Sequence, residues 1–88
     1  MENYLQESLK HNASDPELVS AIEFAQQEWS KYSKAHCDSV YTQWRDGTIR
    51  GVISLSCRIK LTQLRTYELW SDFLQDMEGH SQIPEPKQ

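Results

Sequence analysis

Apolar positions recur along most of the chain at steps of three and four residues, which is the period of an amphipathic helix. The clearest stripe lies in residues 16–43 and comprises Leu18, Ile22, Ala25, Trp29, Tyr32 and His36. A second stripe lies in residues 49–77 and comprises Val52, Leu55, Ile59, Thr62, Thr66, Leu69 and Phe73. An adjoining apolar face of the same segment is formed by Ile53, Cys57, Leu61 and Leu64. A helix that is apolar on two adjoining faces usually packs against two neighbours.

A shorter apolar pattern over residues 2–11 predicts a third helix, which is too short to persist unless it docks on the other two. The segment after it carries the signals of a helix start. Ser14 with Glu17 three residues later is typical of a capping box, and Pro16 suits the first helical turn.

The run Asp46-Gly47-Thr48 is the clearest turn in the chain, because Gly47 permits a positive φ and Thr48 can cap the helix that follows. We therefore expect an all-α fold in a single domain over residues 1–78. Two long helices, over about 16–43 and 49–77, form an antiparallel helical hairpin, and the helix over about 2–11 packs on it. Residues 79–88 are polar with two prolines and predict a disordered C-terminal tail.

The two cysteines are placed symmetrically about this turn. Cys37 lies ten residues before Gly47, and Cys57 lies ten residues after it. In an antiparallel hairpin such positions lie at the same height, because both helices rise equally per residue. A disulfide between them would stabilise the fold by about 3 kcal/mol. The alternative is a cytosolic regulatory bundle with two free buried thiols.

A disulfide implies an oxidising compartment. Met1 leads directly into polar residues, so no signal peptide is visible. If the disulfide forms, we expect the export signal to have been removed from this sequence.

Composition and charge exclude several classes of function. The net charge of −4 argues against a nucleic-acid partner, since phosphate contacts need a basic surface. No apolar run is long enough to span a membrane. His11, His36 and His80 lack the spacing of metal ligands, and no phosphate loop or nucleophile elbow occurs. We therefore expect no metal, no cofactor and no catalytic residue, so the protein is not an enzyme.

Two short motifs resemble a known family. Residues 25–29 read AQQEW and are followed by Cys37, which is similar to the "AQxxW…C" segment of the LprI-type lysozyme-inhibitor-like proteins. Cys57 is followed by LTQLR at residues 61–65, which is similar to that family's "C…LTxxR" segment. The chain departs from the pattern at Ser33, where the family often has arginine. The resemblance covers roughly residues 4–74.

This resemblance implies an exported bacterial envelope protein, periplasmic or secreted, all-helical, with a Cys37–Cys57 bridge and lysozyme inhibition as its activity. The motif residues are Gln26, Trp29, Thr62 and Arg65. We expect their role to be structural. Trp29 and Arg65 are equidistant from the turn and predict a cation–π pair. Gln26 lies opposite Glu68 by the same rule, and with Thr62 it would satisfy polar groups along the seam. The alternative is that Arg65 or Gln26 reaches a partner.

The charged residues are distributed unevenly, with basic residues toward the turn and acidic residues at the far end. Glu68, Asp72 and Asp76 follow one another at four-residue steps along one helix face, which destabilises a helix. This acidic face is either merely solvated or a binding surface for a cationic protein such as lysozyme.

The sequence therefore predicts an exported bacterial binding protein that inhibits host or competitor lysozyme through an acidic surface. The alternative is a structural or assembly module of the envelope that binds another protein or itself and has no lysozyme activity. Trp44 and Trp70 are candidate contacts for that second function.

Overall fold

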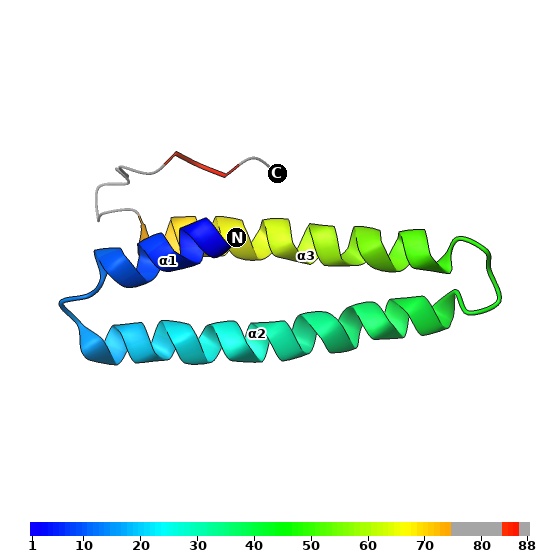
Figure 1. Ribbon diagram of the computed structural model, residues 1–88, viewed down its shortest axis with the longest axis horizontal. Coiled ribbons are helices and arrows are strands. Elements are labelled where there is room, and N and C mark those ends of the chain that lie inside the picture. The colour runs from blue at the N-terminus through cyan, green and yellow to red at the C-terminus, as the bar shows by residue number, and fades with distance from the viewer. Residues whose placement is uncertain (75–83, 87–88) are drawn as a thin grey trace.

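The computed structural model describes residues 1–74 and 84–86. It contains helices α1 (Glu2–His11), α2 (Pro16–Gln43) and α3 (Arg50–Phe73), and the described residues include no strand. Figure 1 shows α2 and α3 running antiparallel, with α1 beside the end of α3 that is far from the turn. The predicted all-α hairpin with a short N-terminal helix is confirmed.

The helix α2 begins one residue later than the predicted capping box implies. The side chain of Asp15, not Ser14, caps the helix, because its carboxylate accepts a hydrogen bond from the backbone N–H of Leu18 at 3.1 Å. The backbone N–H of Asp15 donates to the carbonyl of Asn12 at 2.9 Å, so a turn places Asp15 directly before the helix. Pro16 occupies the first turn as expected.

The turn between α2 and α3 differs from the prediction in its local chemistry. The φ of Gly47 lies outside the left-handed region, and a Cβ added there would lie 3.3 Å from the carbonyl oxygen of Trp44. The Gly47 N–H also donates to that oxygen at 2.8 Å. A side chain at this position would therefore require the backbone at Trp44 to shift by a few tenths of an ångström. Ile49, not Thr48, is the N-cap of α3, and no side-chain hydrogen bond caps it.

The helix α3 is shorter than the predicted 49–77. It ends at Phe73 with Leu74 as its C-cap, so Leu74, which was predicted to be helical, lies just beyond the helix. Residues 75–77 lie outside the described part of the chain. Most of the predicted disordered tail, 79–83 and 87–88, also lies outside it. The described residues 84–86 contact α1, because the Tyr4 hydroxyl donates to the carbonyl of Pro84 at 2.7 Å and Pro86 is buried.

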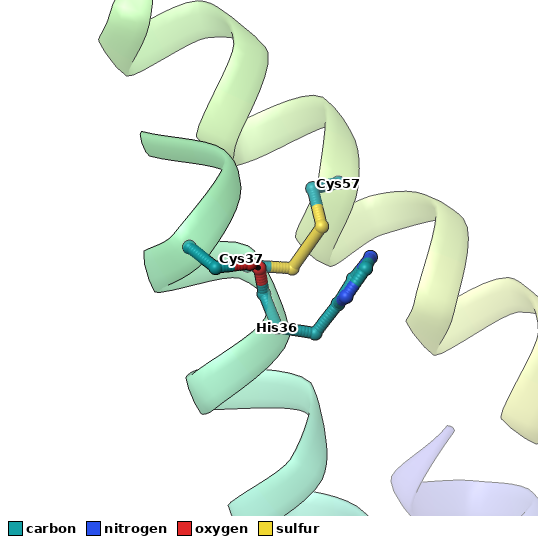
Figure 2. Close-up of a disulfide and its surroundings, with 4 residues drawn as sticks. His36, Cys37 and Cys57 are labelled. Carbon is teal, nitrogen blue, oxygen red and sulfur yellow. Dashed lines mark hydrogen bonds between the residues drawn. A yellow bond between two sulfur atoms is a disulfide. The ribbon is translucent and has the colours of Figure 1, made fainter. Parts of the chain in front are cut away.

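A disulfide joins Cys37 of α2 to Cys57 of α3, as the symmetric spacing predicts. Their Cα atoms are 5.7 Å apart, which lies within the usual range for a disulfide. Figure 2 shows the bridge crossing between the facing sides of the two helices, with His36 beside it. Cys37 is fully buried, so the bridge is part of the core as well as a covalent link.

The core is small and contains several hydroxyl groups. Its buried apolar side chains include Ile22, Leu69 and Leu74, and its buried polar ones include Ser8 and Thr66. Ser8 and Thr66 each donate to a carbonyl four residues earlier in the same helix, at 2.7 Å, so neither hydroxyl is left unsatisfied. A core of this size supplies limited hydrophobic stabilisation, which raises the relative weight of the disulfide.

The buried face of α2 is rotated from the predicted stripe at its turn end. Tyr32 is 55% exposed and His36 is exposed, whereas Ser33 and Cys37 are buried against α3. The bridge explains the difference, because it requires Cys37 to face α3, and a residue one position away points about 100° elsewhere.

The apolar stripe of α3 is buried in its second half and exposed in its first. Thr66 and Leu69 are buried, while Val52, Leu55 and Ile59 are exposed. The covering helix is α1, whose last turn is fixed by a hydrogen bond of 3.2 Å from the Asn12 side-chain amide to the carbonyl of Phe73. With 10 residues against 24, α1 is too short to reach the turn half of α3.

Replacing both cysteines, Cys37→Ser with Cys57→Ser, is expected to lower the free energy of unfolding by about 3 kcal/mol, because the unfolded chain regains the entropy of an open loop. Urea unfolding followed by circular dichroism measures this change. The untreated protein should take up no alkylating reagent without a reductant. An unchanged urea midpoint in the double variant would contradict a stabilising bridge.

Candidate functional site

Charge is segregated along the hairpin. The half far from the turn, residues 1–26 and 62–74, contains seven carboxylate side chains and two lysine or arginine side chains. The turn half, residues 27–61, contains three carboxylates and six lysines or arginines. The molecule therefore has an acidic end and a basic end, as the sequence indicated.

The predicted acidic face is only partly free of internal contacts. Glu68 is exposed, but its carboxylate pairs with the guanidinium of Arg65 at 3.3 Å. Asp72, one turn further along α3, is exposed. Asp76 lies outside the described residues. Of the three predicted carboxylates, Asp72 is thus the one that the structure describes as exposed and without an ion pair.

The motif residues Gln26 and Arg65 contact each other across the seam between α2 and α3. The Nε–H of Arg65 donates to the side-chain oxygen of Gln26 at 3.0 Å, and the Arg65 side chain is only 10% exposed. One terminal nitrogen of the guanidinium is buried with no hydrogen-bond partner. The Gln26 amide also contacts the sulfur of Met1 at 3.5 Å, so the residue that precedes α1 lies against the seam.

The expected cation–π pair between Arg65 and Trp29 does not form. Within the described residues the guanidinium placed over a ring is that of Arg50, 5.2 Å from the ring centre of Tyr41. Gln26 also meets Arg65, not the predicted Glu68. A buried guanidinium has five N–H donors, and an amide oxygen satisfies one of them better than an indole face does. The rule that positions equidistant from the turn lie at the same height was therefore correct to within about one helical turn. It did not identify which neighbouring side chain Arg65 contacts.

A groove of about 620 Å³ follows one side of the seam, and the analysis of apolar periodicity did not predict it. Its walls are Trp29, Lys34 and other residues of α2, and Ser54, Arg58 and Thr62 of α3. We call it the seam groove. Two of the four motif residues, Trp29 and Thr62, line it. The usable signal in the sequence was the set of small serines at seam positions, which leave space that larger side chains would fill.

The seam groove has a smaller counterpart on the opposite side of the two helices. This hollow of about 280 Å³ is lined by residues that include His36, Val40, Ile53 and Lys60. The disulfide lies between the two hollows, because Cys37 lines the seam groove and Cys57 lines the hollow on the opposite side.

A strip of exposed aliphatic residues lies on α3 near the turn. Ile49, Val52, Leu55 and Ile59 are 48%, 66%, 58% and 51% exposed. We call these four residues the α3 strip. Arg58 and Lys60 flank Ile59 and line opposite grooves, so the strip faces away from α2 and has a cation on each side. The hydrophobic pattern located this face but did not show that it is exposed.

The described residues hold no cluster of histidine, cysteine and carboxylate side chains suited to a metal ion. Within the same residues, no helix is both long and apolar enough to cross a membrane.

These features define a small disulfide-linked helical hairpin with charged ends, a groove along its seam and an exposed apolar strip. The family model described as "Lysozyme inhibitor LprI" matches residues 1–69, and the chain belongs to this family. Neither the curated proteins nor the solved structures compared with the chain gave a match. The resemblance seen in the two motifs is confirmed.

Two substitutions at the seam separate the cost of a broken contact from the value of the charge. Gln26→Leu is expected to lower the free energy of unfolding by about 1–3 kcal/mol, because it leaves the buried Nε–H of Arg65 without an acceptor. Arg65→Met removes the buried charge itself and should cost less. Urea unfolding of both variants measures the order, and a larger loss for Arg65→Met would contradict it.

Proposed function

We propose that this protein is an exported bacterial envelope protein that inhibits lysozyme by binding it. Membership of the lysozyme-inhibitor family over residues 1–69 is the observation that carries this proposal. The disulfide supports export, since such bonds persist in oxidising compartments such as the bacterial periplasm.

The acidic end is the surface that we propose for lysozyme. C-type lysozymes are commonly cationic, and complementary charge steers association and suppresses unsuitable partners. Asp72 on α3 lies at this end together with Glu17 and Glu23 on α2, and all three side chains are exposed. Glu68 contributes less to this surface, because Arg65 already neutralises part of its charge.

Reversing two charges tests this surface. The double variant Asp72→Lys with Asp76→Lys should weaken inhibition roughly tenfold, since each reversal removes an attraction and adds a repulsion worth about 0.5–1 kcal/mol. The rate of turbidity loss of a bacterial cell-wall suspension, with lysozyme and increasing inhibitor, measures the effect. Asp46→Lys is the matched control for the single variant Asp72→Lys, because both change the net charge equally and Asp46 is exposed in the turn at the opposite end.

The outcomes of this assay separate the function from the surface. If the unaltered protein does not slow lysis at high micromolar concentration, the inhibitor function is wrong. If it inhibits and the double variant inhibits equally well, the acidic end is not the contact. Equal weakening by Asp46→Lys would indicate a general effect of net charge.

The α3 strip favours a second candidate function, that of an assembly module which binds another envelope protein. The strip continues the face of α3 on which α1 docks, so it already has the shape that accepts a helix. Arg58 and Lys60 flank it, and Arg50 lies in the same turn half of the molecule. If two copies of this chain packed through their α3 strips, these cations would face one another and repel. The occupant that fits is a partner's amphipathic helix with carboxylates beside its apolar positions.

The substitution Leu55→Lys tests this second function. Its effect on unfolding should be within about 0.5 kcal/mol, because Leu55 is exposed. A designed helical peptide with leucines at three- and four-residue steps and flanking glutamates should bind the unaltered protein and lose about tenfold in affinity for the variant. Fluorescence anisotropy of the labelled peptide measures this.

The control for this experiment is the same peptide with lysines in place of the glutamates, which should not bind. Sedimentation of the unaltered protein provides an independent check. A dimer that Leu55→Lys disrupts would overturn the partner-helix assignment, since the strip would then join two copies of this chain.

A further inference from the structure

We propose that the seam groove binds an acidic oligosaccharide, that is, a short sugar chain that carries carboxylates. This inference goes beyond the proposed function, because the groove lies between the long helices and not at the acidic end, and its occupancy requires no lysozyme.

The groove exists because the side chains at this part of the seam are small. Ser33 is buried in its floor beside Cys37, and Ser54 faces them from α3. Larger residues at these positions would fill the space, as they do in most helix pairs. The resulting volume of about 620 Å³ lies within the range of small-molecule sites.

The walls of the groove suit a sugar. Trp29 is half-buried and offers a flat apolar ring against which the C–H face of a pyranose can pack. Hydroxyls of Ser30 and Thr62 lie along the same groove and can both donate to and accept from sugar hydroxyls. An aromatic platform with hydroxyl groups around it matches the alternation of apolar face and polar rim on a sugar ring.

The charges around the groove select an acidic ligand. Lys31 and Lys34 line the α2 wall, Arg58 lines the α3 wall, and Asp38 is the one carboxylate among the lining residues described. Lys31 pairs with Glu28 at 3.2 Å and Lys34 pairs with Asp38 at 2.8 Å. Both pairs are well exposed, and such pairs are weak enough to exchange for a ligand carboxylate. Arg58 makes no ion pair within the described residues.

The disulfide makes the groove a rigid one. It links Cys37, which lines the groove, to Cys57 on the other helix, so the two helices that form the walls cannot separate at this point and little ordering is needed when a ligand enters. The hollow on the opposite side shares this rigidity but is smaller, has no tryptophan and has Lys60 as its one lysine or arginine. That hollow supplies a matched control within the same molecule.

The test uses two disaccharides that differ in one acidic group. The probe is N-acetylglucosaminyl-N-acetylmuramic acid, which has a lactyl carboxylate, and the control is the neutral dimer of N-acetylglucosamine. Titration of the full chain followed by amide NMR shifts should show the acidic probe binding at least about fivefold more tightly. The shifts should include Ser30 and Ser33 on α2 and Ser54 on α3.

Three variants locate the binding. Arg58→Ala should weaken binding of the acidic probe about fivefold, and Lys60→Ala, which changes the opposite hollow, should leave it unchanged. Ser54→Leu fills the groove and should abolish binding of both sugars. If Ser54→Leu does not fold, Arg58→Ala decides alone, because its side chain is exposed and its loss leaves the core intact.

Three results would overturn the proposal. These are no binding of the acidic probe at 10 mM, equal affinity for the acidic and neutral sugars, and an Arg58→Ala variant that binds like the unaltered protein. None of them bears on lysozyme inhibition, because lysozyme is absent from the experiment.

Discussion

The covalent bond between Cys37 and Cys57 is the constraint on which the rest of this structure depends. A chain of 88 residues with few fully buried apolar side chains has little hydrophobic stabilisation to spare. The bond sets the height at which α2 and α3 face each other, and it sets which side of α2 faces inward. It also holds the two helices together at that point, with the Cα atoms of the two cysteines 5.7 Å apart.

The remaining features follow from that register. With Cys37 facing α3, Ser33 falls on the seam one turn away and leaves room for the seam groove, while Tyr32 turns to solvent. Further along the seam, Gln26 accepts a hydrogen bond from Arg65, and Met1, the residue before α1, contacts Gln26. Thus the short family motifs, which span the cysteines and these contacts, describe one physical unit: a bridge, a paired guanidinium and the groove between them. The charged ends and the α3 strip lie outside this unit.

The sequence predicted the parts of the fold that depend on distance along a helix. Equal spacing of the cysteines from Gly47 predicted their pairing, and periodicity predicted three helices within a few residues of their bounds. It did not predict exposure of Val52 and Leu55, because a stripe shows which face is apolar but not how far a neighbouring helix extends. Nor did it predict the partner of Arg65, since several acceptors lie within one turn. The groove left no periodic signal because it results from missing side-chain volume.

The charge distribution has a consequence that depends on length scales. The molecule is a rod with extents of 50 × 25 × 17 Å, and its acidic and basic halves lie along the long dimension. The Debye length at physiological ionic strength is about 8 Å, far shorter than the rod. A partner at one end is therefore screened from the charges at the other end. The net charge of −4 does not describe the electrostatic attraction or repulsion that a partner meets at either end. Electrostatically, the hairpin acts as two small proteins of opposite sign held at a fixed separation.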